Sequence, residues 1–259
     1  MNQQINTPRR SSGFTLIELM LSMTFVAVLL MAIAMTIIQI ANIYNRGMTV
    51  KEVNQASRAI ADDMRRGVGA SEVFLVNANG TDSADSFAVR SGSTVVGGRL
   101  CTGTFSYLWN IEKAVQAEEA VGTKDVTLTH ILSSSGTVGD PIRFVKIPDT
   151  GKKYCLKTSG ALVNKNIVDA DAKIMTDLLD TGDHKLGLQR LSITTKDSVY
   201  DASTGQRLYM VNYTLGTGDT AAMNSTQSAC LPPGDPNSNL TYCNVQAFSI
   251  VLRVGSAVN

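Results

Sequence analysis

The uncharged stretch at positions 19–45 constrains this chain more than any other feature of its sequence. Its 27 residues run from Leu19 to Asn45 without one Asp, Glu, Lys or Arg. At about 1.5 Å of rise per residue, an α-helix of this length is about 40 Å long, which exceeds the roughly 30 Å hydrocarbon core of a bilayer. The segment is therefore long and apolar enough to span a membrane.

A single carboxylate, Glu18, stands at the start of this stretch. An unpaired charge in a membrane helix costs about 3 kcal/mol even on the mildest scale, so Glu18 needs a partner. The free backbone N–H groups of the first helical turn are one possibility. An ammonium group of a neighbouring chain is the other. That second pair forms only when two subunits lie in register, and it would therefore set their stagger during assembly.

The segment before the apolar stretch is short and polar, and it carries Arg9 and Arg10. The positive-inside rule predicts that this segment stays in the cytoplasm while the C-terminal bulk crosses the membrane. A secretory signal peptide would place its small-residue cleavage site after the apolar run, whereas Gly13 precedes it. Cleavage between Gly13 and Phe14 would remove the basic leader, retain the helix and create a new ammonium group four residues from Glu18.

The octapeptide at 13–20, Gly-Phe-Thr-Leu-Ile-Glu-Leu-Met, closely resembles the N-terminus of the type IV pilin and pseudopilin family. In this comparison Gly13 precedes the scissile bond, Phe14 is the first mature residue and Glu18 is the fifth. The resemblance covers residues 9–66 and is weak beyond them. It implies cleavage by a prepilin peptidase, N-methylation of Phe14, and assembly into a filament with the apolar helices at its centre. An uncleaved single-pass anchor is the alternative.

The helix is expected to continue past the membrane and to end at Gly67, which offers a C-terminal cap. Apolar side chains recur there at three- and four-residue spacing, with charged side chains between them, and Arg58 can pair with Asp62. No proline occurs between positions 14 and 66. The pattern predicts one helix of about 50 residues whose second half packs against the head. The apolar positions are Ile43, Val50, Val53, Ala56, Ile60 and Met64, and the charged ones are Lys51, Glu52, Arg58, Asp62, Arg65 and Arg66.

After Gly67 the pattern changes from helical to alternating. A long helix followed by strands favours an α+β fold, with an antiparallel sheet packed on the helix. We expect a leader at 1–13, an apolar helix half at 14–45, an amphipathic half at 46–67 and a β-rich head at 68–259. Within the head, a short helix is expected at 170–179, an exposed loop at 133–140 and a turn at Gly97-Gly98. The candidate strands are 71–76, 86–89, 105–111, 126–131, 142–147, 153–157, 189–195, 207–215 and 245–254.

All four cysteines, Cys101, Cys155, Cys230 and Cys243, lie on the side expected to be translocated, where disulfides persist. Three pairings are possible from the sequence. We favour Cys101 with Cys155, both in strand-like contexts, and Cys230 with Cys243, which would close a proline-rich loop and contribute about 3 kcal/mol. Zinc is the alternative ligand, but no Cys-x2-Cys pair occurs and the two histidines, at 130 and 184, stand alone.

Two loops partly mimic calcium-binding loops, but neither has the full pattern. The acids at Asp169 and Asp171 are followed by Lys173 where a third ligand belongs. The alternating residues Asp235, Asn237 and Asn239 lack both the turn glycine and a closing acid, so solvated turns explain both loops.

Composition and motifs favour a structural protein over an enzyme. With 44% hydrophobic and 17% charged residues and a formal net charge of +1, the chain is neither disordered in composition nor attracted as a whole to polyanions. Nucleophile, metalloprotease and phosphate-loop motifs do not occur in it. We therefore expect no catalytic residues and no cofactor.

The resemblance implies a type IV pilus subunit, and the large loop-rich head favours a minor or accessory pilin over a major one. The expected partners are a prepilin peptidase, other pilin or pseudopilin subunits and the cytoplasmic membrane, with the product in a surface pilus or a periplasmic pseudopilus. A pseudopilin of type II secretion is the first alternative, although Glu18 distinguishes the chain from the tip pseudopilin. A head that binds DNA or a surface is the second. That reading rests on Arg58, Arg65, Arg66, Arg99, Lys152 and Lys153.

Overall fold

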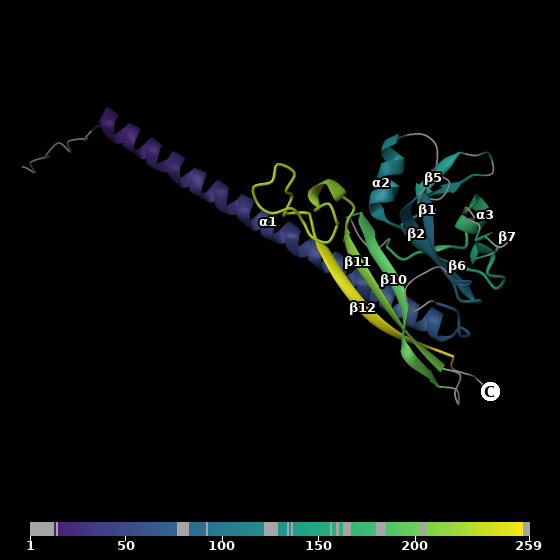
Figure 1. Ribbon diagram of the computed structural model, residues 1–259. Coiled ribbons are helices and arrows are strands. Elements are labelled where there is room, and N and C mark those ends of the chain that lie inside the picture. The colour runs from purple at the N-terminus through teal and green to yellow at the C-terminus, as the bar shows by residue number, and fades with distance from the viewer. Residues whose placement is uncertain are drawn as a thin grey trace, which may run out of the picture. The chain divides into compact units, whose positions relative to one another are not determined.

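The computed structural model describes residues 13, 15–76, 83–91, 93–121, 129–133, 135, 137–155, 157–158, 161–162, 167–179, 185–201 and 206–255. The chain divides into two compact units, Met1–Asn45 and Arg46–Asn259. One long N-terminal helix is followed by antiparallel sheets (Figure 1). The predicted α+β class is therefore confirmed.

Helix α1 spans Leu16–Gly69 without interruption. The prediction that Gly67 caps the helix is wrong, because the helix passes through this residue and Gly67 lies on its buried face. A Cβ atom there would lie 2.3 Å from the hydroxyl oxygen of Tyr107, so any larger residue at this position would displace the end of that side chain. The helix instead ends at Gly69, and Ser71 just beyond it donates from its backbone N–H and its hydroxyl to the carbonyl of Val68, at 3.1 and 2.6 Å.

The amphipathic stripe in the second half of α1 is largely as predicted. Val53, Ala56, Ile60 and Met64 are buried, whereas Ile43 is exposed. Glu52, predicted on the outer face, is also buried. Asp62 forms its ion pair with Arg65, at 3.6 Å, and not with the predicted Arg58.

A five-stranded antiparallel sheet has the order β1-β2-β3-β6-β9, and a three-stranded antiparallel sheet has the order β10-β11-β12. Two short hairpins, β4-β5 and β7-β8, complete the described strands. The strands of the large sheet are β1 Ser86–Ser91, β2 Thr94–Cys101, β3 Phe105–Asn110, β6 Phe144–Pro148 and β9 Thr176–Asp177. The other strands are β4 His130–Leu132, β5 Val138–Pro141, β7 Lys157–Thr158, β8 Ala161–Leu162, β10 Leu186–Asp201, β11 Gln206–Thr217 and β12 Val245–Val254. The remaining helices are α2 Glu112–Val121, α3 Asp169–Ala172 and the 3-10 turns η1 Lys153–Cys155 and η2 Thr220–Ala222.

Several predicted elements differ from the observed ones. Residues 71–76 form no strand, and 153–155 form a 3-10 turn. The helix expected at 170–179 is reduced to α3, and the loop expected at 133–140 includes the start of β5. The turn expected at Gly97-Gly98 is wrong, because both glycines lie inside β2. A Cβ at Gly98 would lie 2.2 Å from the ring of Trp109 on the paired strand β3, so the glycine makes room for that ring.

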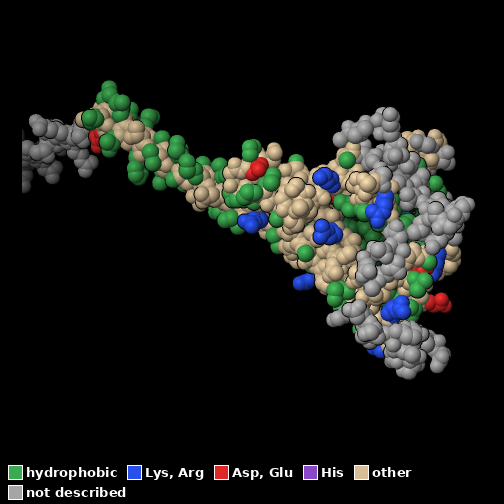
Figure 2. Space-filling view, in the orientation of Figure 1, with side chains coloured by type: hydrophobic (Ala, Val, Ile, Leu, Met, Phe, Trp, Pro, Cys, Tyr) green, Lys and Arg blue, Asp and Glu red, His purple; other side chains and the backbone are tan. Residues whose placement is uncertain are grey.

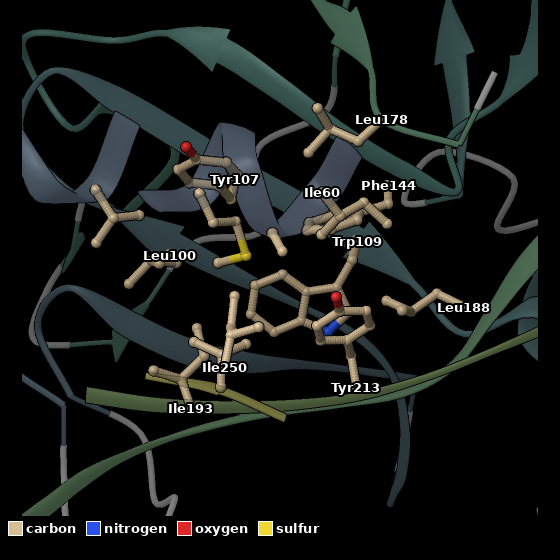
Figure 3. Packing of buried hydrophobic residues seen from close by; sticks show 14 of the residues in the cluster. Ile60, Leu100, Tyr107, Trp109, Phe144, Leu178, Leu188, Ile193, Tyr213 and Ile250 are labelled. Atoms are coloured by element: carbon tan, nitrogen blue, oxygen red, sulfur yellow. The ribbon is translucent and has the colours of Figure 1, made fainter. Parts of the chain in front are cut away.

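The main core forms where the second half of α1 and both sheets converge. Ile60 from the helix, Trp109 and Phe144 from the large sheet, and Tyr213 and Ile250 from the small sheet belong to one cluster of buried residues (Figure 3). A second cluster, which contains Leu108 and Val145, fills the opposite face of the large sheet. The large sheet is thus buried on both faces.

Both disulfides have the pairing favoured from the sequence. Cys101 at the end of β2 is bonded to Cys155 in η1, and Cys230 is bonded to Cys243. The first bond lies in the second core cluster, and the second closes the loop that precedes β12.

One carboxylate, Asp63, joins α1 to the large sheet through two polar contacts. The ammonium of Lys146 lies 2.9 Å from its Oδ1, and the hydroxyl of Tyr107 donates to its Oδ2 at 3.2 Å. The side chains of Lys146 and Asp63 are only 14% and 22% exposed. Burial, together with the charge of Asp63, raises the pKa of Tyr107, so its phenol remains a neutral donor.

We predict that Asp63→Asn lowers the free energy of unfolding by about 2 kcal/mol, because it leaves the half-buried Lys146 without its anion. For a head of this size the melting temperature should fall by about 4–8 °C, measured by thermal unfolding of the full chain in lipid nanodiscs. Asp62→Asn is the matched control on the neighbouring residue. Its pair with Arg65 is exposed, so the free energy should change by less than about 0.5 kcal/mol. Equal effects of the two substitutions would contradict the prediction.

Candidate functional site

The first half of α1 presents apolar side chains to its surroundings on every side. Its most apolar 18-residue window has no buried residue, and Leu16, Leu30 and Ile38 are 77%, 59% and 60% exposed. Hydrophobic side chains cover this part of the helix in Figure 2. An apolar surface of this extent is typical of a segment in contact with lipid or with other protein chains. The helix is long and apolar enough to be a membrane anchor.

Three serine and threonine hydroxyls in this segment are satisfied by the helix itself. Ser22, Thr24 and Thr36 donate to the carbonyls of Leu19, Leu21 and Ala32, each at 2.9 Å. In a hydrocarbon environment an unsatisfied hydroxyl is costly, whereas one bonded to a preceding carbonyl needs no water. These three residues are therefore compatible with a helix surrounded by lipid or by other apolar helices.

Glu18 lies in the first turn of α1, where Thr15 caps the helix. The backbone N–H of Glu18 bonds the carbonyl of Thr15 at 3.1 Å and its hydroxyl at 3.3 Å. Within the part of the chain that the structure describes, the carboxylate of Glu18 has no ion pair or hydrogen bond. Leu21, Phe25 and Val28 line the helix surface beside it, together with Ser22 and Thr24. The two hydroxyls donate to backbone carbonyls, so the one acidic group of the segment has no charged neighbour among the residues that line this surface.

The predicted processing site flanks this first turn. Gly13 is exposed, precedes the helix and has open space where a Cβ atom would stand. Phe14 and the leader arginines at 9 and 10 lie outside the described residues. The predicted ammonium of Phe14, and its pair with Glu18, therefore stay predictions.

Of the six basic residues considered for DNA binding, Arg58, Arg65 and Arg66 are exposed on α1, whereas the three in the rest of the head are buried or paired. Arg99 is only 1% exposed, and burial lowers its pKa to about 10. Lys152 pairs with Asp85 at 2.7 Å, and Lys153 pairs with Asp171 at 2.5 Å. Arg99 therefore cannot belong to a basic surface, and both lysines carry acidic partners.

The loops considered for calcium are accounted for by protein partners. Asp171 accepts from Lys153 and from the hydroxyl of Tyr154, and Asp235 accepts from the backbone N–H of Asn237. Among the described residues, no group of three or more His, Cys, Asp and Glu side chains is arranged to hold a metal ion. His130 bonds Thr129 at 2.9 Å and is buried, whereas position 184 lies outside the described residues.

Comparisons of the chain with models of protein families, with characterised proteins and with solved structures find no match.

We predict that Val28→Arg reduces membrane insertion, because a charged side chain near the middle of an apolar helix raises the free energy of insertion by about 3 kcal/mol. The measurement is the fraction of full-length chain that resists alkaline extraction from membranes. Val28→Leu is the control and should behave as the unsubstituted chain. If the unsubstituted chain were itself fully extracted, α1 would not be a membrane anchor.

Proposed function

We propose that this chain is a prepilin, cleaved between Gly13 and Phe14, whose mature form is a minor or accessory subunit of a type IV pilus. The observation that carries the proposal is the exposed apolar half of α1, with Glu18 as its one acidic group in the first turn. A helix of this kind is suited both to storage in a membrane and to packing among copies of itself. The α+β head with two disulfides is consistent with a subunit that works outside the cytoplasm.

The role proposed for Glu18 follows from electrostatics in a medium of low dielectric constant. A carboxylate among apolar side chains gains far more from a cation than it would in water, because little solvent screens the pair. Cleavage at Gly13 supplies one such cation, the ammonium of Phe14, on every mature chain. Its pairing with Glu18 of a neighbouring subunit would favour one axial offset between subunits over all others.

A pseudopilin of a type II secretion system is the alternative assignment, because a pseudopilin would undergo the same processing and carry the same kind of helix. Deletion of the gene distinguishes the two. A minor pilin predicts fewer surface fibres, whereas a pseudopilin predicts that export of a folded protein stops and that the fibres persist.

We predict that Glu18→Gln leaves membrane insertion intact but lowers incorporation into fibres by at least about tenfold, the equivalent of about 1.4 kcal/mol. The amide keeps the shape of the side chain and removes the charge that attracts the ammonium. The measurement is the ratio of sheared-fibre to membrane-bound protein at native expression. Glu72→Gln, an exposed acid in the head, is the control and should not change this ratio. Normal incorporation of the Glu18 variant would show that the charge of Glu18 does not set the axial offset between subunits.

The processing step has its own test, by mass analysis of the protein purified from its native host. The expected product begins at a methylated Phe14. Retention of residues 1–13 in the working form would contradict the proposal, because the ammonium would then be absent from the helix terminus.

A further inference from the structure

The head contains a cleft of about 460 Å³, lined entirely by described residues. It lies among the start of α2, the turn after β11 and the loop closed by Cys230 and Cys243. Its volume falls within the range of small-molecule binding sites. No residue of α1 lines the cleft, so ligand binding there is independent of the proposed role of the helix in a pilus.

One wall of the cleft is a fixed carboxylate. Glu112 accepts from Nε of Arg143 at 3.0 Å and from the amide of Gln116 at 3.3 Å. Its side chain is only 1% exposed. A Cβ atom at Gly187 would lie 2.5 Å from Cγ of Glu112, and one at Gly218 would lie 3.3 Å from its Oε1. The backbone therefore packs directly on this acid, which cannot change its position to suit a ligand.

The charges that line the cleft balance. Glu112 and Asp219 are matched by Arg143 and Lys185. A phosphate or a metal cation would meet as much repulsion as attraction in such a site. A neutral ligand rich in hydroxyl groups suits it better, because charged side chains of both signs are strong hydrogen-bond donors and acceptors.

The rim of the cleft carries an exposed aromatic ring. Tyr242 lines the cleft and is 45% exposed, so part of its side chain is open to a ligand. The Cys230–Cys243 bond fixes its loop, and the backbone N–H groups of Tyr242 and Cys243 bond the carbonyl of Asn239 at 3.2 and 2.8 Å. Because the backbone that carries the ring is fixed, a ligand that stacks on the ring does not have to order the loop.

A polar group without a described partner lies in the same wall. The hydroxyl oxygen of Thr217 is buried and makes no hydrogen bond to any residue that the structure describes. Buried hydroxyls are normally satisfied, and an exception in a cleft indicates where a water molecule or a ligand hydroxyl belongs.

We propose that this cleft binds a neutral sugar ring. The ring of Tyr242 stacks on the apolar C–H face of the sugar, Asp219 and Lys185 bond its outer hydroxyls, and one hydroxyl directed inward satisfies Thr217. A subunit displayed outside the cell with such a cleft would contact glycans.

The test is saturation-transfer NMR on the full chain in lipid nanodiscs, which avoids glycoside detergents that would compete for the cleft. The probes are glucose, galactose, mannose and N-acetylglucosamine, with glycine as a zwitterionic comparison. We expect transfer to the ring protons of at least one sugar, with a dissociation constant of about 1 mM. No transfer to any of the four sugars, or transfer to glycine alone, would overturn the proposal.

Two variants locate the binding in the cleft. Tyr242→Ala should weaken sugar binding at least about fivefold, whereas Tyr242→Phe, which keeps the ring, should stay within about twofold. Thr217→Val should weaken binding about threefold while its melting temperature stays equal or rises, because it removes a hydroxyl that is unsatisfied in the free protein. Thr214→Val, on the same strand but outside the cleft, is the matched control. Binding that persists unchanged in both Tyr242→Ala and Thr217→Val would place the sugar elsewhere and overturn the assignment.

Discussion

The structure depends on a change of surroundings partway along one helix. From Leu16 to Tyr44 the side chains of α1 are exposed and almost entirely apolar, whereas from Thr49 onward one face is buried by the head. The hydrophobic effect stabilises the second half by ordinary core packing, but it leaves the first half without a partner in the single chain. Water is a poor solvent for that half, so lipid or other helices must surround it. The proposed assembly into a filament depends on that unburied surface.

Within the apolar half, the few polar groups differ in whether the chain satisfies them. The hydroxyls of Ser22, Thr24 and Thr36 bond carbonyls one turn back, so they require nothing from outside. Glu18 is different, because a carboxylate gains most from a full positive charge and none of the described residues that line the surface beside it carries one. A charged group without a partner among the described residues is a natural determinant of how chains meet. This contrast, more than apolarity itself, favours ordered assembly over simple anchoring.

The features predicted correctly are those that local sequence determines. The length of α1 follows from its apolar spacing and the absence of proline, and strand β12 has the predicted bounds. The errors arise where a distant residue decides the local structure. Gly98 belongs to a strand because the ring of Trp109 needs its space, and Gly67 continues a helix because Tyr107 packs on it. The resemblance around Glu18 rests on eight consecutive residues and stays a prediction. The cleft could not, because Glu112 meets Arg143 across 31 positions, and α2 itself was not predicted.

The second disulfide connects the stability of the head with its cleft. Around it only Ala222, Met223 and Cys243 form a separate buried cluster among the described residues, with Cys230 and Val245 packed against them. Three buried side chains provide little hydrophobic stabilisation for a loop this long, and a covalent bond that closes about 14 residues contributes about 3 kcal/mol by restricting the unfolded chain. The disulfide therefore provides for this loop the stabilisation that the main core provides elsewhere in the head. Because Tyr242 adjoins Cys243, the same bond also fixes the backbone that carries the aromatic side chain at the rim of the cleft. Stability and ligand recognition in this part of the head thus rest on one covalent constraint.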